Sequence, residues 1–362
     1  MIETAVIAAI AVAFVISALA TSLSRAVAYR LGMLDEPARH KAHAGPIPML
    51  GGSAIFATVL GLSLLATALA SYWATRGVPE WLPESLARHI PGAAARAPVA
   101  LGILAGALLL HVVGLIDDRR NLGPWVKIIA ELGVCAGVVI FCRVRVLTVA
   151  GEPASAILTV IWLLAITNAF NFLDNMDGLA AGVGLIVSGA LLAAAIGVGQ
   201  VFVPAWLCLI FGALGGFLLF NSPPARVFMG DAGSLVVGYL LAVLSSMTTY
   251  VAPGETYYAY GIFVPLVVMA VPLYDMVSVV MLRIRDRRNP MVGDRRHFSH
   301  RLIRRGMSVR KAVLTIYLCT AATALSATLL SRVGTVGAAM LFVQTLIILL
   351  VLALLESGEG RA

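Results

Sequence analysis

Long apolar runs recur along nearly the whole chain, and short polar segments separate them. Each run holds around twenty residues, which is about the length that an α-helix needs to cross the hydrocarbon core of a bilayer. We expect membrane-spanning helices near residues 3–24, 49–71, 98–116, 124–142, 155–173, 178–197, 201–220, 232–250, 258–281, 312–331 and 334–355. The pattern therefore predicts an all-α, polytopic integral membrane protein with about eleven transmembrane helices.

The composition supports this interpretation. Of the 362 residues, 60% are hydrophobic and only 12% are charged, whereas a soluble protein averages roughly a quarter charged residues. The gaps between the runs are too short for a soluble domain, so we expect residues 1–362 to form a single transmembrane domain. The first run has no basic n-region and is too long for a cleaved signal peptide, so it is expected to remain as the first helix.

The basic residues are distributed unequally between the two sets of alternate loops. Most of the 26 Lys and Arg residues lie in one set, chiefly at 25–48 and 282–311. Short basic loops stay in the cytoplasm, which predicts an external N-terminus and a cytoplasmic C-terminus. Topology and attraction to anionic lipid headgroups explain most of the net charge of +8. They do not explain why other polar residues gather on the same face.

Five polar motifs fall at helix ends on this predicted cytoplasmic face. They are "DEPARHKAHAGPIPMLGG" (35–52), "HVVGLIDDRRNLGPWVK" (111–127), "NAFNFLDNMDGL" (168–179), "NSPPARVFMGDAGS" (221–234) and "RRNPMVGDRRHFSHRLIRRG" (287–306). The predicted external loops contain nothing comparable. This convergence indicates one cytoplasm-facing site that is built from several helix ends.

The residue types at these ends suit a metal and a phosphate. Asp117 and Asp118 are adjacent carboxylates, which repel each other and are costly near a membrane, and a divalent cation would relieve both costs. Asp231 lies between glycines that allow close backbone approach. Asn168 and Asn171 share one helix face. Hard oxygen ligands favour Mg²⁺, or Mn²⁺, over Zn²⁺, and Mg²⁺ is usually held together with substrate phosphates.

These motifs together resemble a known family. "KAHAGPIPMLGG", "GLIDDRRN", "NAFNFLDNMDGLAAG", "FMGDAGSL", "VPLYDMVSV" and "DRRHFSHRL", in this order, are similar to those of the polyprenyl-phosphate N-acetylhexosamine-1-phosphate transferases. The resemblance covers residues from about 30 to 310. It implies a Mg²⁺-dependent membrane enzyme that transfers a sugar 1-phosphate from a UDP-sugar to a polyprenyl phosphate such as undecaprenyl phosphate and releases UMP. The single transmembrane domain would then be the catalytic one.

The resemblance also implies roles for single residues. Asp117 matches the carboxylate that activates the lipid phosphate or attacks directly, and Asp118 matches its neighbour, which is needed for activity. Asp231 matches a metal ligand, and Asn171 lies near the metal or the diphosphate. Lys127 matches a lysine that contacts phosphate. On the residues alone, Asp117 and Asp118 could instead merely cap a helix.

Further positions match the nucleotide and sugar sites. Asn168, Asp174 and Asp177 match positions around the nucleotide, and Phe228 matches a residue near the uracil. As an alternative, Asp174 and Asp177 could be ordinary loop carboxylates.

The basic loop 282–311 matches the cytoplasmic sugar-recognition loop of the family. Its His297 and His300 match the histidine motif of that loop. Lys41 and His43, in the first motif, match substrate-binding positions but could equally be topology signals.

Other polar residues have simpler interpretations. An intrahelical pair with Lys127, one turn away, is the favoured account of Glu131. A structural role is favoured for His111. Asp275 is either a partner of the site or a buried structural residue. Arg283, with three further arginines (Arg285, Arg287 and Arg288), is interpreted as a lipid-facing topology charge rather than as a substrate ligand.

Departures from the family pattern refine the substrate. Asn121 stands where a third Asp often follows, which weakens any role for a third carboxylate. His297-Phe-Ser-His300 replaces the consecutive histidines typical of the enzyme that uses UDP-MurNAc-pentapeptide. "NFLDNMDGL" likewise departs from the Thr-Asp-Gly sequence of that enzyme. We therefore expect UDP-N-acetylglucosamine or a related UDP-HexNAc as donor, with phospho-N-acetylmuramoyl-pentapeptide transferase as the alternative.

A transporter is the rival class, since intramembrane carboxylates also mark carriers. A transporter would place polar residues near the middle of the membrane and show repeat symmetry, and this chain shows neither. We expect a protein of the inner membrane whose active site faces the cytoplasm, with membrane lipid but no nucleic acid among its partners. Family members are often dimers, so a homodimer is left open.

Overall fold

The described part of the chain is helical apart from two very short strands. A computed structural model describes residues 2–36, 45–250, 259–287 and 296–357. The longer helices are α1 (Ile2–Leu31), α2 (Gly51–Arg76), α5 (Ala97–Arg120), α6 (Pro124–Phe141), α7 (Glu152–Leu173), α8 (Leu179–Gly197), α9 (Phe202–Asn221), α10 (Asp231–Met247), α12 (Ala270–Arg285), α14 (Val309–Ala327) and α15 (Thr335–Ser357). The short elements are β1 (Leu34–Asp35), β2 (Ile47–Pro48), α3 (Glu84–Ala87), α4 (Ile90–Ala95), η1 (Thr148–Ala150), η2 (Ala259–Phe263), α11 (Val264–Val268) and α13 (Phe298–Arg304).

The antiparallel pair of β1 and β2 is the one departure from the all-α prediction among the described residues. The residues from Pro48 onward position the start of α2. Phe228 N–H donates to the Pro48 carbonyl at 2.8 Å, and the Gly51 and Gly52 N–H groups donate to the carbonyls of Phe228 and Met229 at 3.0 and 2.9 Å. Residues 48–52 and 228–229, far apart in the sequence, therefore form one backbone-bonded unit beside the start of α10.

The long helices have the lengths and compositions of membrane spans. Among the described residues, eight helices are long and apolar enough to cross a bilayer, or nine if the pair η2–α11 and α12, bent by 63°, counts as one span. The protein is therefore a polytopic, helical membrane protein. The predicted spans near 232–250 and 312–331 correspond to α10, which has only 17 residues, and to α14, which has Arg310 and Lys311 in its first turn. The count of eleven thus stays a prediction.

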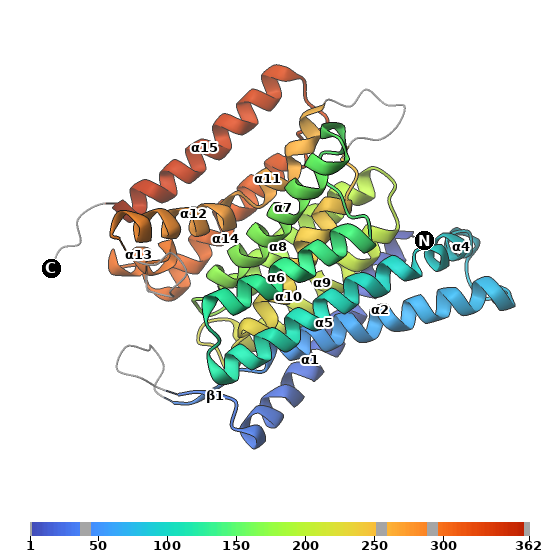
Figure 1. Ribbon diagram of the computed structural model, residues 1–362, viewed down its shortest axis with the longest axis horizontal. Helices are drawn as coiled ribbons and strands as arrows, with labels where there is room; N and C mark the ends of the chain where they lie inside the picture. Colours follow the sequence, from blue (N-terminus) through green and yellow to red (C-terminus); the bar gives the residue numbers. More distant parts are fainter. Residues whose placement is uncertain (1, 37–44, 251–258, 288–295, 358–362) are drawn as a thin grey trace.

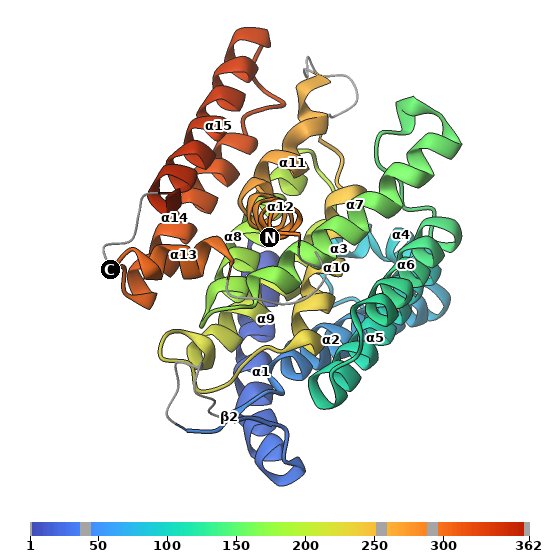
Figure 2. The same cartoon turned by 60° about the vertical axis from the view of Figure 1, so that its left-hand side comes forward.

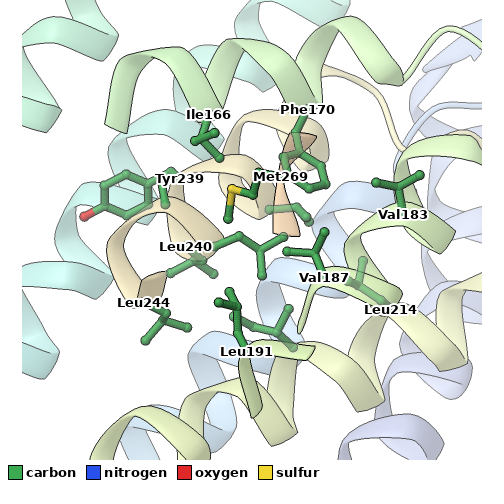
Figure 3. Close-up of a cluster of buried hydrophobic side chains, with 14 of the residues drawn as sticks. Ile166, Phe170, Val183, Val187, Leu191, Leu214, Tyr239, Leu240, Leu244 and Met269 are labelled. Atoms are coloured by element: carbon green, nitrogen blue, oxygen red, sulfur yellow. The ribbon is translucent and has the colours of Figure 1, made fainter. Parts of the chain in front are cut away.

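Helix α10 forms the centre of the buried core. Figure 3 shows side chains of α7, α8 and α9 gathered around Leu240 and Leu244 of α10, and these side chains are almost completely buried. The hydroxyl of Tyr239 donates to the Ile103 carbonyl of α5 at 3.2 Å. Because this core surrounds α10, the position of its first residue, Asp231, is set by packing on several sides.

Helices α1 and α9 pack at close range. A Cβ atom at Gly212 would lie 2.4 Å from the Ile10 carbonyl oxygen, and one at Gly216 would lie 2.3 Å from that of Phe14. Small residues of this kind let helices in a membrane approach closely. Ser17 of α1 also donates to the Ala213 carbonyl at 2.7 Å. Figure 2 shows α1 beside α9, with the C-terminal end of α1 at the lower edge of the molecule.

Helix α15 lies at the opposite edge of the molecule from α1 and α2 (Figure 1). Only 17% of the most apolar stretch of α15 is buried, against 61% for the corresponding stretches of α8 and α9. It contacts α12, α13 and α14. The C-terminal end of α15 therefore lies beside the short helix α13.

Candidate active site

One cavity of about 520 Å³ collects polar side chains from several helix ends. It lies where α5 and α7 end, where α6 and α10 begin and where α12 ends. Six of the predicted site residues line it: Asp117, Lys127, Asn168, Asn171, Asp231 and His297. The motifs at these helix ends thus meet in space.

Lys127 joins two carboxylates at this cavity. Its Nζ lies 3.0 Å from Asp117 Oδ2 and also contacts Asp231 Oδ2. The other oxygen of Asp117 accepts a hydrogen bond from Leu122 N–H at 2.6 Å. Asn121, with φ of 51°, ends α5 in the left-handed conformation and turns the chain toward α6. The tight turn between α5 and α6 therefore brings Lys127 back over Asp117.

Asp118 supports the start of α10 rather than lining the cavity. Its two carboxylate oxygens accept hydrogen bonds from the N–H groups of Asp231 and Ala232, at 2.8 and 3.1 Å. These are amides of the first helical turn, which have no partners within the helix and favour a negative charge. Gly230 has φ of +70°, and a Cβ there would lie 2.6 Å from Asp118 Oδ2. Asp118 thus caps a helix in another part of the chain and holds Asp231 in place.

His111 belongs to the same support. Its Nδ1 lies 2.9 Å from the Ala232 carbonyl oxygen, and its ring stacks on Phe56 with centroids 4.5 Å apart. It is buried and is not among the residues that line the cavity. This placement agrees with the structural role that was favoured for it.

Glu131 pairs with an asparagine and not with Lys127. It is fully buried and accepts a hydrogen bond from the Asn168 amide of α7, which also donates to the Leu164 carbonyl at 3.0 Å. The predicted intrahelical pair was wrong because Lys127 Nζ reaches the carboxylates of Asp117 and Asp231 instead. Glu131 and Asn168 together form part of the cavity wall.

The two aspartates after α7 lie outside the cavity lining. Asp174 interacts with the Gly230 backbone amide, and burial, followed by the negative charges of Asp231 and Asp118, raises the pKa of its carboxyl well above the usual range. Asp177 accepts a hydrogen bond from Ala225 N–H at 2.8 Å. Both carboxylates thus face the 222–230 loop. In this structure they fit the alternative of loop carboxylates better than direct contact with the cavity.

Four other predicted contacts do not line the cavity or lie outside the described residues. Phe228 is half-buried, and its backbone is bonded to Pro48 and Gly51. His300 is half-buried on α13 and is also absent from the lining. Lys41 and His43 lie outside the described residues.

A buried hydrogen-bond network positions His297 at the cavity. Its Nδ1 lies 2.9 Å from Asp275 Oδ2, and Asp275 Oδ1 accepts the Phe298 N–H at 3.0 Å. The His297 ring meets Phe172 of α7 edge to face, with centroids 5.6 Å apart. Asp275 is therefore a partner of the site, the first of its two interpretations, because it orients the histidine.

Arg283 is a cavity residue that the sequence interpretation missed. It is only 1% exposed, it lines the cavity, and its guanidinium carbon lies 5.2 Å from the centre of the Phe172 ring. The prediction that it faces lipid was wrong, whereas Arg285 and Arg287 are exposed; Arg288 lies outside the described residues. One feature of the sequence could have indicated this role. Arg283 lies two helical turns after Asp275, in the only turn of α12 that contains arginines.

Asn175 was also missed, although it lies in the most conspicuous polar motif. Its Oδ1 accepts a hydrogen bond from the Ser299 hydroxyl at 2.6 Å, and it lines the cavity. This bond ties the end of α7 to α13. The sequence spacing of more than a hundred residues carries no sign of that contact.

The residues predicted to hold Mg²⁺ fit a metal that arrives with phosphate. Asp231 and Asn171 both line the cavity, and Asn171 donates its amide N–H to Ser234 Oγ at 3.0 Å, which leaves its amide oxygen for a ligand. Among the described residues, no cluster of three or more His, Cys, Asp and Glu side chains could hold a metal. Mg²⁺ needs only one or two carboxylates when phosphates and water complete its shell.

Known proteins are similar to this chain over most of its length. The model of glycosyl transferase family 4 matches residues 100–249. A probable undecaprenyl-phosphate N-acetylglucosaminyl 1-phosphate transferase of Bacillus subtilis is 32% identical over 321 residues, which are 85% of this chain and 81% of the relative. The chain belongs to glycosyl transferase family 4. This confirms the family that the motifs predicted.

Two further relatives are similar over a comparable length. A decaprenyl-phosphate N-acetylglucosaminephosphotransferase of Mycobacterium tuberculosis is 33% identical over 84% of this chain and 78% of its own length. An undecaprenyl-phosphate alpha-N-acetylglucosaminyl 1-phosphate transferase of Escherichia coli is 28% identical over 85% of this chain and 79% of its own length. The residues matched by the family model include Asp117, Lys127 and Asp231, while Arg283 and His297 lie beyond them.

Proposed function

We propose that the protein transfers N-acetylglucosamine 1-phosphate from UDP-N-acetylglucosamine to undecaprenyl phosphate or a similar polyprenyl phosphate and releases UMP. The relatives that are similar to this chain over most of its length are named for this activity. The observation that carries the proposal is the Lys127 ammonium held between Asp117 and Asp231 in a cavity formed by helix ends. Such a site pairs a phosphate-binding cation with carboxylates that suit a metal or a proton.

The donor diphosphate would lie between Lys127 and Arg283. Both cations line the same cavity, and an arginine suits bidentate contact with phosphate. Asp231 and Asn171 would hold Mg²⁺, with Mn²⁺ as the alternative. When bound, the metal would neutralise charge on the diphosphate and on the departing UMP.

The acceptor would reach the same cavity from the side, with its prenyl tail still in lipid. One oxygen of its phosphate forms a bond to the sugar-bearing phosphorus of the donor, and the bond from that phosphorus to the oxygen of UMP breaks. Asp117 would orient the acceptor phosphate, take up its proton or attack first. Lys127 Nζ and Leu122 N–H fix the Asp117 carboxylate, so its position is set before the substrates bind.

Residues 296–304, here called the His297 segment, would recognise the sugar. His297 is oriented by Asp275 and meets the cavity beside Phe172. Asn168 would line the nucleotide side, while Asp174, Asp177 and Phe228 would act there through the 222–230 loop. The names of the relatives favour N-acetylglucosamine over the muramoyl-pentapeptide donor.

We further infer eleven spans, an external N-terminus, and a cytoplasmic C-terminus and active site in the cell membrane. The predicted spans correspond to eleven helical segments if α10, the bent pair and α14 are included. The arginines in the last turns of α5 and α12 lie at the cavity end, which supports the orientation. A transporter is disfavoured because the polar cavity lies at helix ends rather than midway along them.

Purified protein with undecaprenyl phosphate, Mg²⁺ and UDP-N-acetylglucosamine tests the proposal. We expect UMP release together with a lipid-linked sugar, and both should vanish with EDTA and return with added Mg²⁺. Asp117→Asn and Asp231→Asn should each lower kcat by at least about 100-fold. Glu152→Gln is the matched control, because that carboxylate is 85% exposed.

The outcomes separate the alternatives. Turnover with another UDP-sugar alone would keep the reaction and overturn the choice of sugar. No turnover with any UDP-sugar, together with substrate uptake by proteoliposomes, would favour a transporter over a transferase. Turnover that survives EDTA would contradict the proposed metal.

A further inference from the structure

We propose that Glu356, in the last turn of α15, is a positioning residue that holds the His297 segment against the cavity through Arg301. The proposal rests on the proposed function for its kinetic consequence. Its structural part stands on contacts between α15, α13 and α12, none of which involves the Asp117–Lys127–Asp231 centre.

Glu356 is bonded through both carboxylate oxygens. Its Oε2 accepts hydrogen bonds from Arg301 Nε at 3.0 Å and Nη2 at 2.8 Å, and its Oε1 accepts one from the Tyr274 hydroxyl at 2.6 Å. The carbonyl of Glu356 also accepts a bond from Arg305 Nη2 at 3.1 Å. The side chains of Glu356 and Arg301 are each 11% exposed, so water screens this pair only weakly.

From Arg301 the contacts lead directly to His297. Arg301 Nη1 donates to the Arg296 carbonyl, the peptide group that joins Arg296 to His297. Arg301 Nη2 also donates to Ser278 Oγ at 2.9 Å, and Ser278 in turn donates to the Asp275 carbonyl at 3.0 Å. Asp275 is the residue that orients the His297 ring. Arg301 thus links Glu356 to both groups that set the position of His297.

The position of Glu356 in α15 shows that the stability of this helix does not explain the presence of a carboxylate there. It is the only charged residue in α15, and it lies at the C-terminal end of the helix, where the macrodipole disfavours an anion. The other residues of α15 are mostly apolar and little buried. A carboxylate here is stabilised by Arg301 and Tyr274, and it adds a specific attachment for α13.

Because α13 has only seven residues, it depends on such attachments for its position. Its other described polar links to the helices include the bond from Phe298 N–H to Asp275 and the Ser299–Asn175 bond. Loss of the Glu356 link should therefore allow His297 to move relative to Lys127 and Asp117, which are held separately.

Glu356→Gln is the first test, since it keeps the shape and removes the charge. We expect the KM for UDP-N-acetylglucosamine to rise about tenfold, as for the loss of one charge-assisted hydrogen bond. The KM for undecaprenyl phosphate should change less than about twofold. Tyr274→Phe should cause a smaller shift in the same direction, and Glu152→Gln, at an exposed carboxylate, should cause none.

Hydrogen exchange gives a readout that does not depend on activity. Amides of residues 296–304 should exchange faster in Glu356→Gln than in the wild type, while those of 117–131 should not. Arg301→Gln should reproduce both effects, and the double variant should be no worse than either single one. An exchange rate unchanged in Glu356→Gln would overturn the link.

The kinetic result separates this proposal from the proposed function. If the wild type transfers the sugar and Glu356→Gln leaves both KM values unchanged, Glu356 is not a positioning residue. If the wild type transfers no sugar with any UDP-sugar, the proposed function fails, and hydrogen exchange still decides whether Glu356 holds α13.

Discussion

At the scale of single residues, the cavity is organised by charges that hold one another. Lys127 binds Asp117 and Asp231, and with both carboxyls ionised this trio carries one net negative charge. A divalent cation would reverse the sign of that charge and, with the Arg283 guanidinium, leave an environment that attracts a diphosphate. Removing one member leaves another charge without its partner, which is costly in a partly buried site.

Arg283 provides a prediction at this scale. Arg283→Lys should raise the KM for UDP-N-acetylglucosamine about tenfold, or about 1.4 kcal/mol, because lysine loses the planar contact with Phe172 and bidentate binding of phosphate. Steady-state kinetics with varied donor measure this. Arg285→Lys, two positions on and exposed, should change little. Equal effects of the two substitutions would show that Arg283 acts only as a surface charge.

At the scale of elements, the start of α10 depends on a backbone conformation at Gly230 that only glycine adopts easily. Gly230 combines φ of 70° with ψ of 173°, a region that other residues rarely occupy. Its amide neighbours are bonded by Asp118 from α5, and the preceding residues are bonded to the start of α2. Two distant segments, the end of α5 and the start of α2, therefore hold Asp231 at the cavity.

Gly230→Ala tests this arrangement. The added Cβ would lie 2.6 Å from Asp118 Oδ2, and the backbone strain should lower the free energy of unfolding by about 1–3 kcal/mol. Thermal unfolding in detergent measures the loss, and transfer activity should fall with it. Gly133→Ala in α6 is the matched control, because its Cβ would meet nothing within 4 Å and alanine favours a helix. A Gly230→Ala protein as stable as this control would refute the strain.

At the scale of the whole molecule, the cavity and the cluster around Arg301 lie at the same end of the helix bundle, whereas α3 and α4 lie at the far end of α2 and α5. The arginines in the last turns of α5 and α12, Arg119, Arg120, Arg283 and Arg285, lie at the cavity end. If the positive-inside rule sets the orientation, this end faces the cytoplasm.

Cysteine labelling checks that orientation. In a background with the four native cysteines replaced, Arg304→Cys should react with a membrane-impermeant maleimide only in inside-out vesicles. Arg88→Cys should react only in right-side-out vesicles. Both native side chains are exposed, so access to the label is not limited by burial. The reverse pattern would invert the proposed topology.

The sequence by itself determined the helices, their polar ends and the family. Apolar runs specify spans locally, because each backbone group in a membrane must be bonded within its own helix. Hence the predicted spans near 98–116 and 155–173 correspond closely to α5 and α7. The motifs at Asp117, Lys127, Asn171 and Asp231 were found in the same way, since charged and amide groups stand out in an apolar chain.

Only the tertiary structure decided which polar groups meet. Lys127 is one turn from Glu131, yet its ammonium binds Asp231, more than a hundred positions away. Arg283 is buried while Arg285 faces outward, and Asp118 caps a helix that begins at Asp231. These choices depend on how distant helices cross and on the desolvation of each charge. Local spacing contains neither quantity, so the partners of Glu131, Arg283 and Glu356 had to come from the fold.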